Sequence, residues 1–177
     1  MTGSKPMKNE LRYPDGRTII CKAWDTDQDG EYLMVEHRMT QKGAINGPHW
    51  HPVLTERFMI EQGTIHFKVD GDVMAAGPGS IVSVWPRQVH QFWKEDDELL
   101  VMRHEIRPPG NHWRMFELIH KLETEGLMNR KGIPRNPLWL GAAWASMDGY
   151  IAGPPRFVQK VLLGGLGRLA KAFGYKV

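Results

Sequence analysis

Hydrophobic and polar residues alternate with a period close to two from Thr18 to about Ile106. Short runs rich in Val, Ile, Met and aromatic residues recur there, and they read TIICKAW, YLMVEHRM, TIHFKV, SIVSVW and ELLVMRHEI. Turn-forming sequences such as DTDQDG, GPG and KEDD separate the runs, and Asp70-Gly71 suits a two-residue type I′ hairpin turn. Many short strands at this spacing predict an antiparallel sandwich or barrel and argue against a parallel α/β sheet.

The period becomes helical after the sequence RPPG at residues 107–110. Apolar residues at helical spacing predict a helix over residues 111–126, with Asn111 as its N-cap and Gly126 at its end. The stretch LWLGAAWASM predicts a short buried helix, and a third helix follows Pro154-Pro155. This third helix carries an apolar stripe that consists of Val158, Leu162, Leu166, Leu169 and Phe173.

The change of period divides the chain into three parts. We expect a disordered N-terminus over residues 1–10, a β-barrel over residues 11–108 and a C-terminal helical extension over residues 109–177. The extension would pack on the barrel or on a partner subunit. The predicted fold class is therefore mainly β, an antiparallel barrel followed by an α-helical extension, and 177 residues suffice to bury a sizeable core.

Cysteine usage and the N-terminal sequence indicate a compartment. The single cysteine, Cys21, excludes an internal disulfide framework and suits a reducing environment. The first residues, MTGSKPMKNELR, lack the apolar segment of a signal peptide, and no run of 18 apolar residues occurs. We therefore expect a cytoplasmic protein that does not enter a membrane.

Positive charge is concentrated in the C-terminal tail. The net charge is +3, and the last 22 residues contribute five cations and no acid, namely Arg156, Lys160, Arg168, Lys171 and Lys176. The rest of the chain carries about −2, so no general basic field for nucleic acid is expected. The tail could be a membrane-surface helix. However, Gly164, Gly165 and Gly167 weaken an isolated helix and permit close packing, which favours docking on the protein.

Candidate metal ligands lie in the segment GAINGPHWHPVLTERFMIEQG, from Gly43 to Gly63. Side chains at positions i and i+2 of a strand point to the same face, so His49 and His51 project together. Glu56 follows on the next predicted strand and can add a carboxylate. Imidazole and carboxylate ligands suit one divalent transition metal ion (Fe, Mn, Ni, Co, Cu or Zn), and the absence of thiolates argues against a structural zinc site.

The spacing of these residues resembles a known family. Gly43, His49, His51, Glu56 and Gly63 match the first sequence motif of the cupin superfamily position for position. The stretch GPGSIVSVWPRQVHQFW resembles the second motif, with Pro86 and His90 in place and Gln88 where glycine is usual. The pattern HxHPxxxERF with a tail PPRFVQ…GYK is similar to a group of small bacterial cupins.

The resemblance implies a jelly-roll barrel, usually a homodimer, in which His90 joins His49, His51 and Glu56 as a metal ligand. It also implies dioxygenase, isomerase, decarboxylase or lyase activity on a small substrate that chelates the metal through oxygen. Glu56 would serve as the catalytic base. Strand parity then predicts a pocket lined by Phe58, Ile60, Phe92, Met102 and His104.

Three functions stay open at this point. The first is a metal-dependent enzyme, with dioxygenase chemistry slightly ahead of isomerase or lyase chemistry. The second is a non-catalytic cupin that binds or senses a small molecule. The third is a structural dimer in which the helical tail carries the function.

Other polar residues have competing interpretations. The segment from Asp25 to Glu36 fits the EF-hand loop pattern D-x-D-x-D-G-x5-E, but its flanks are β-like, which favours a polar hairpin turn. His37 and His66 lie within predicted strands and are expected to be exposed or bonded in the barrel wall. His112 and His120 are expected on a helix surface.

Overall fold

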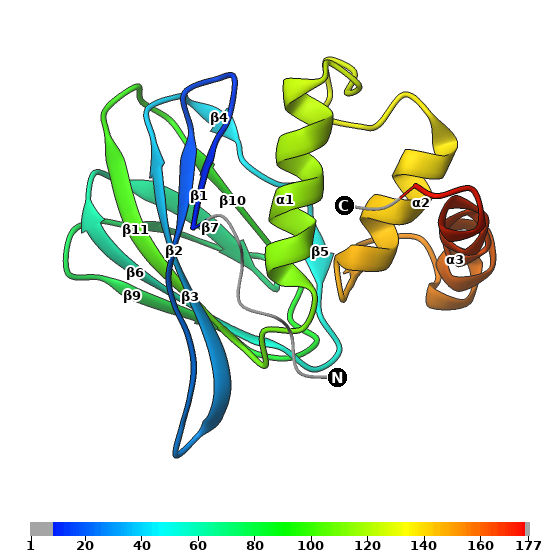
Figure 1. Ribbon diagram of the computed structural model, residues 1–177. Helices are drawn as coiled ribbons and strands as arrows, with labels where there is room; N and C mark the ends of the chain where they lie inside the picture. Colours follow the sequence, from blue (N-terminus) through cyan, green and yellow to red (C-terminus); the bar gives the residue numbers. More distant parts are fainter. Residues whose placement is uncertain (1–8, 176–177) are drawn as a thin grey trace.

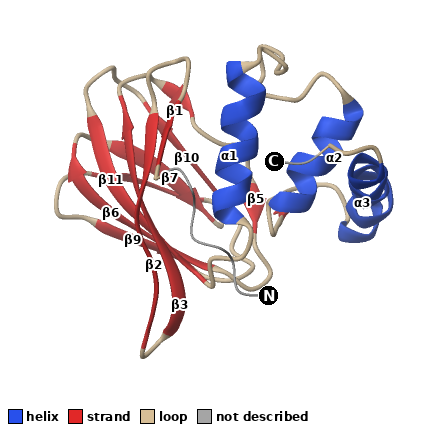
Figure 2. Cartoon of the chain, viewed as in Figure 1, coloured by secondary structure: helices blue, strands red, loops and turns tan. Residues whose placement is uncertain are grey.

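The computed structural model describes residues 9–175, which form two antiparallel sheets and three helices (Figures 1 and 2). The first sheet has the strand order β1 (Glu10–Arg12), β2 (Thr18–Asp27), β3 (Gly30–Met39), β11 (Leu100–Arg107), β6 (Thr55–Gln62) and β9 (Ile81–Val84). The second has the order β12 (Tyr150–Ile151), β5 (His49–Trp50), β10 (His90–Lys94), β7 (Ile65–Val69) and β8 (Asp72–Ala76), and β4 (Gly43–Ala44) also pairs with β10. The predicted antiparallel architecture is confirmed.

The N-terminus predicted to be disordered covers residues 1–10. Residues 1–8 of this segment lie outside the described residues. Asn9 and Glu10 belong to the fold, since β1 begins at Glu10 and the Asn9 carbonyl accepts a hydrogen bond of 2.7 Å from the Cys21 N–H. The tight turn between β7 and β8 is as predicted. Asp70 and Gly71 both have positive φ, 49° and 104°, as a type I′ turn requires.

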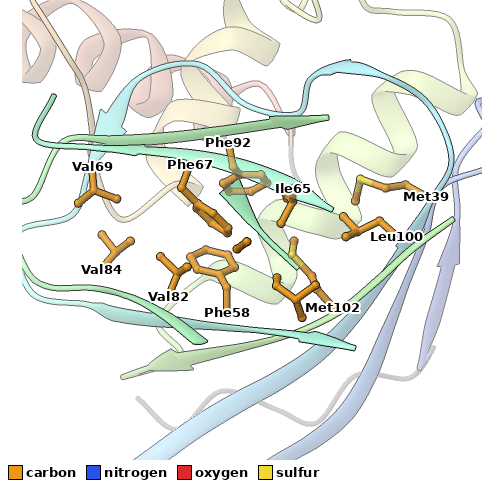
Figure 3. Close-up of a cluster of buried hydrophobic side chains, with 12 residues drawn as sticks. Met39, Phe58, Ile65, Phe67, Val69, Val82, Val84, Phe92, Leu100 and Met102 are labelled. Atoms are coloured by element: carbon orange, nitrogen blue, oxygen red, sulfur yellow. The ribbon is translucent and has the colours of Figure 1, made fainter. Parts of the chain in front are cut away.

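The two sheets pack against each other through aromatic and aliphatic side chains (Figure 3). Phe58 of the first sheet lies 5.1 Å from Phe67 and 5.3 Å from Phe92 of the second, measured between ring centroids. A second cluster joins Leu33 and Val35 of β3 to helix α1 (His112–Thr124). The barrel and the first helix of the extension therefore share one continuous set of buried contacts.

The hairpin of β2 and β3 projects beyond the other strands (Figure 1) and contains the EF-hand-like pattern in strands and turn. Both carboxylate oxygens of Asp27 accept hydrogen bonds from Arg107, at 2.8 and 2.6 Å. Glu36 is buried and lies within 3.3 Å of Lys22 and 2.6 Å of Arg38. Strands flank the pattern, and cations pair with the carboxylates of Asp27 and Glu36, which favours the interpretation as a polar hairpin.

Helices α2 (Pro137–Ser146) and α3 (Arg156–Ala172) form a pair on the far side of α1 from the barrel (Figure 1). Glycine allows their close approach. A Cβ atom on Gly141 would lie 2.5 Å from the Leu166 carbonyl carbon, and one on Gly167 would lie 3.0 Å from the Gly141 oxygen. Among the tail glycines, Gly167 makes this close contact with α2 whereas Gly165 faces open space, and docking of the tail on the barrel or on a partner subunit stays a prediction.

The apolar stripe predicted for the third helix is only partly buried. Leu162, Leu169 and Phe173 are 61%, 51% and 70% exposed, whereas Val158 and Leu166 are half-buried and Leu166 lies against Gly141 of α2. Helical periodicity located an apolar stripe correctly but could not tell which side of the helix meets α2. A partner subunit covering the exposed stripe stays a prediction. None of the described helices is long and apolar enough to cross a membrane.

The strand β12 interrupts the region that the sequence predicts as loop and helix. It pairs with β5, with Tyr150 opposite Trp50 and Ile151 opposite His49. The helical extension therefore returns to the barrel and adds an edge strand to the second sheet.

Candidate metal centre

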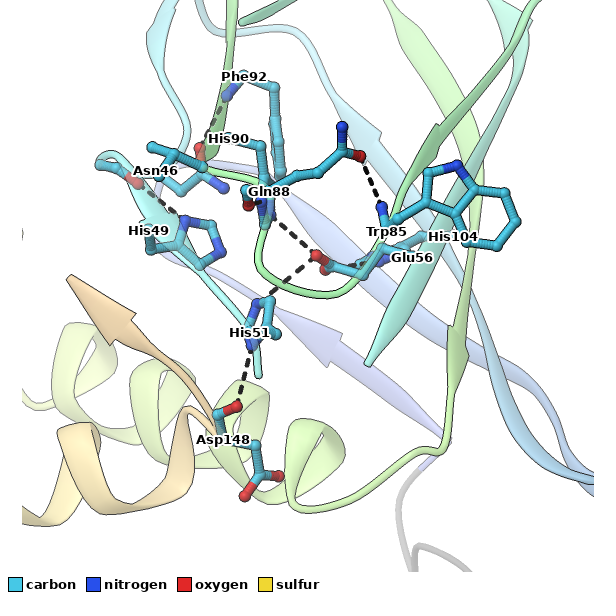
Figure 4. A network of polar contacts seen from close by, with 12 residues as sticks. Asn46, His49, His51, Glu56, Trp85, Gln88, His90, Phe92, His104 and Asp148 are labelled. Atoms are coloured by element: carbon cyan, nitrogen blue, oxygen red, sulfur yellow. Dashed lines mark hydrogen bonds and ion pairs between the residues drawn. The ribbon is translucent and has the colours of Figure 1, made fainter. Parts of the chain in front are cut away.

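Both sheets contribute to the histidine cluster. His49 and His51 come from β5 and the residue after it, His90 from β10 of the same sheet, and Glu56 from β6 of the other sheet. His90 pairs directly with His49 in the β5–β10 ladder. One ligand atom from each of the four residues lies within 4.8 Å of the other three (Figure 4). The structure thus brings together the four residues that the sequence predicts as metal ligands.

A backbone carbonyl orients each of the three histidines. His49 Nδ1 lies 2.9 Å from the Gly47 oxygen, His51 Nδ1 lies 3.2 Å from the Asp148 oxygen, and His90 Nδ1 lies 3.1 Å from the Gln88 oxygen. A carbonyl oxygen can only accept, so Nδ1 of each ring carries a proton. In the neutral ring the lone pair is then on Nε2, which is the atom left for a metal ion.

The atoms that face one another at the centre of the cluster fit a cation. Within residues 9–175, His51 Nε2, Glu56 Oε2 and His90 Nε2 are buried and have no partner with hydrogen-bond geometry. Glu56 Oε2 lies 2.8 Å from His90 Nε2 and 3.5 Å from His51 Nε2. Lone pairs directed at a carboxylate oxygen repel unless a proton or a metal ion lies between them. This donor set is therefore suited to a metal ion.

Glu56 is held from behind by a second row of histidines. His104 Nε2 lies 3.0 Å from Glu56 Oε1 in an ion-pair contact without hydrogen-bond geometry, and His104 Nδ1 lies 3.3 Å from His37 Nε2. With a proton on Nε2, the His104 ring turns a positive N–H edge toward the carboxylate while its Nδ1 accepts from His37. The ring of His104 also stacks on Phe58, at 4.2 Å between centroids. His104 thus lies between the carboxylate, His37 and the aromatic core.

Burial and the carboxylate control the protonation of the cluster. Burial would raise the pKa of Glu56, but contacts with His104 and His90 hold that pKa well below its usual value, so the carboxylate is ionised. Burial lowers the pKa of His49 and of His51 to about 4. Burial also opposes the charged form of His90, yet Glu56 raises the pKa of His90 above its ordinary value. Among the three histidines of the cluster, His90 is thus the one whose charged form is favoured, so a metal ion bound there would compete with its proton.

The predicted apolar pocket residues face the interior of the barrel, as strand parity requires. Phe58, Ile60, Phe92 and Met102 are 0–7% exposed and belong to the core cluster in Figure 3. A contact between these four residues and a ligand stays a prediction. His104, the fifth member of the predicted pocket, also points inward and binds Glu56.

The sequence did not predict that two further residues, His112 and Asp148, lie near the cluster. His112 was expected on a helix surface, but it is 2% exposed and its ring centroid lies 5.2 Å from that of His51. Asp148 supplies the carbonyl that orients His51 from a position 97 residues away. Neither residue lies in a motif, and no local pattern reveals a contact between the extension and the barrel.

A family model described as a cupin domain matches residues 37–104, the segment that contains all four cluster residues. Residues 37–104 form a cupin domain. The second row of the site, His37 and His104, marks the two ends of the matched segment. No match is found among curated protein sequences.

Solved structures similar to this chain include proteins described as cupins. An RmlC-like cupin from Shewanella frigidimarina shares 13% identity, with 60% of this chain and 89% of that chain covered and a TM-score of 0.50. KdgF from a Halomonas species shares 16% identity over 63% and 99% of the two chains, with a TM-score of 0.49. A cupin-superfamily sugar phosphate isomerase from Silicibacter pomeroyi shares 16% identity over 57% and 69%, with a TM-score of 0.45. At these identities the similarity concerns the fold alone.

Proposed function

We propose that His49, His51, Glu56 and His90 bind one divalent transition metal ion and that the cupin domain is a metal-dependent enzyme. The substrate would be a small organic molecule that chelates the metal through oxygen. The main support is the common orientation of the three histidines, whose Nδ1 atoms face backbone carbonyls while their Nε2 atoms remain for the metal. Because backbone carbonyls already orient these rings, the rings would lose little conformational entropy when a metal ion binds.

The chemistry follows from the ligand set and its surroundings. A bound metal would supply a Lewis acid or a redox centre next to the substrate. Glu56 is ionised and lies in ion-pair contact with His104, so it can accept a proton from a substrate carbon or hydroxyl. His49 is only half-buried whereas the other three ligands are buried, which opens the cluster to a substrate on the side of His49. Dioxygenase chemistry is our first expectation, and isomerase or lyase chemistry is the second.

Elemental analysis of protein purified without an affinity tag or chelator tests the metal site. Wild type should contain close to one transition metal ion per chain, and the double variant His49→Ala/His51→Ala should contain almost none. His66→Ala is the matched control, because His66 lies on β7 and is not a member of the cluster. Equal, negligible metal in all three proteins, even after reconstitution, would refute the proposal.

Assays of the loaded protein then separate the function classes. Turnover of a hydroxy-ketone, diol or keto-acid substrate, with oxygen consumption for the iron form, supports an enzyme. Metal-dependent binding of such molecules without turnover supports a binding or sensing cupin instead. The homodimer and the cytoplasmic location stay predictions, and analytical ultracentrifugation tests the former.

A further inference from the structure

A segment of the C-terminal extension reaches into the candidate metal centre. The Asp148 carbonyl oxygen is the hydrogen-bond partner of His51 Nδ1. The next residue, Gly149, lies directly against the same ring, since a Cβ atom there would be 2.7 Å from His51 Nδ1 and 2.8 Å from the Trp50 oxygen. Only glycine leaves room at this position, so the backbone of residues 148–149 forms one wall of the His51 site.

The three ligand histidines differ in where this support comes from. The carbonyls that orient His49 and His90 belong to Gly47 and Gln88, each two residues before the histidine in its own strand or turn. The carbonyl that orients His51 belongs to Asp148, outside the matched cupin domain. The cupin domain therefore orients two of its three histidines, and the extension orients the third.

Several contacts fix residues 148–152 in place. The Asp148 carboxylate accepts hydrogen bonds from the Asn111 backbone N–H and, at 2.9 Å, from the Asn111 side-chain amide at the start of α1. Asn111 therefore sits at the predicted N-cap position, but its side chain does not cap the helix. On the other side, β12 pairs with β5, and the Ala152 N–H donates to the Pro48 oxygen at 2.9 Å.

Gln159 of α3 closes the outer edge of β12. Its Oε1 accepts from the Ile151 N–H at 3.0 Å, and its Nε2 donates to the Ile151 oxygen at 2.8 Å. These are the two hydrogen bonds that a neighbouring strand would make. Gln159 is 3% exposed, and its remaining contacts go to Trp144 Nε1 at 3.2 Å and the Pro154 oxygen at 2.9 Å. The Gln159 side-chain amide thus makes the hydrogen bonds that a further strand beside β12 would make.

We propose that residues 148–151, clamped by Gln159, are a positioning element of the metal centre. The segment holds His51 in the tautomer with the proton on Nδ1 and directs Nε2 toward Glu56. Loss of such a partner behind a ligand histidine lowers metal affinity about 10- to 100-fold. The effect on metal affinity rests on the proposed metal binding, whereas the effect on the tautomer does not.

The test combines two measurements on matched glycine variants. Gly149→Ala places a methyl group against His51, whereas Gly165→Ala places one in open space on α3. The His51 tautomer is read by ¹⁵N NMR of the metal-free protein at pH 7.5, and the affinity for Co²⁺ is read by competition with a chelator. We expect Gly149→Ala to lose the single Nδ1–H tautomer and to bind Co²⁺ about 10- to 100-fold more weakly. Gly165→Ala should match wild type in both measurements.

A second pair of variants, on α3, tests whether Gln159 holds residues 148–151 in place. Gln159→Met keeps the length of the side chain but removes its hydrogen bonds to Ile151, and Lys160→Met changes its exposed neighbour. Gln159→Met should shift the same two readouts in the same direction and Lys160→Met should not. This pair also decides the matter if Gly149→Ala does not fold.

Folded Gly149→Ala and Gln159→Met proteins that keep the wild-type tautomer would overturn the inference. If wild type binds no Co²⁺, the proposed function fails, and the tautomer measurement still tests the positioning by residues 148–151.

Discussion

Removing the imidazole of His104 should destabilise the metal-free protein about as much as truncating a large core side chain. His104 is 3% exposed and lies between Glu56 Oε1 at 3.0 Å and His37 Nε2 at 3.3 Å. In His104→Leu both of these buried atoms lose their partner. An unpaired buried polar group costs about 1–3 kcal/mol, and more when it is charged, so the two losses together amount to about 2–6 kcal/mol. The free energy of unfolding of a domain is only about 5–15 kcal/mol.

The matched control for this substitution is His104→Gln. The side-chain amide of glutamine can place an N–H near the position of the imidazole Nε2 and so keep a donor for Glu56. We therefore expect His104→Gln to retain more of the unfolding free energy than His104→Leu. Metal affinity should follow the same order, because the orientation of the Glu56 carboxylate depends on this donor.

Urea unfolding of the metal-free proteins at pH 7.5, followed by circular dichroism, measures the difference. A free energy of unfolding for His104→Leu within about 0.5 kcal/mol of wild type, the range of an ordinary surface substitution, would refute the reasoning. Equal losses in His104→Leu and His104→Gln would show that packing on Phe58 matters and that the polar contact with Glu56 does not.

Three further predictions concern the titration of the cluster, the core and the hairpin. Burial lowers the pKa of His49, His51 and His112 to about 4, so the unfolded chain, with histidine pKa near 6.5, binds more protons between these values. The unfolding free energy of the metal-free protein should therefore fall by about 1 kcal/mol per pH unit for each of these histidines as the pH decreases from 6.5 to 4, and urea titrations showing no decrease would contradict this. Phe58→Ala removes a ring that is 0% exposed and contacts Phe67 and Phe92, and it should cost about 3–5 kcal/mol of unfolding free energy in the same assay. Millimolar Ca²⁺ should leave the Tm unchanged in a thermal melt, because Arg107 occupies both carboxylate oxygens of Asp27; a Tm increase that is lost in Asp27→Asn would show a calcium site.

The sequence determined the features that depend on local periodicity. Alternation with a period of two located the strands, and the same period placed His49 and His51 on one face because neighbours at i and i+2 share a face. Positive φ at Asp70 and Gly71 follows from the residue types that tolerate it. Motif spacing added Glu56 and His90, and the fold placed them beside the two histidines.

The tertiary structure alone decided how the extension meets the barrel. Helical periodicity marked the apolar stripe of α3, yet Leu162 and Leu169 are exposed because the side of the helix with Leu166 and Gly167 packs on α2. The burial of His112 and the bond from His51 to Asp148 connect residues that are far apart in the chain. Such contacts depend on the relative placement of two folded elements, about which a local pattern of hydrophobic and polar residues carries no information. The residue types of the candidate metal centre are thus specified by the sequence, whereas the orientation of His51 is set by packing.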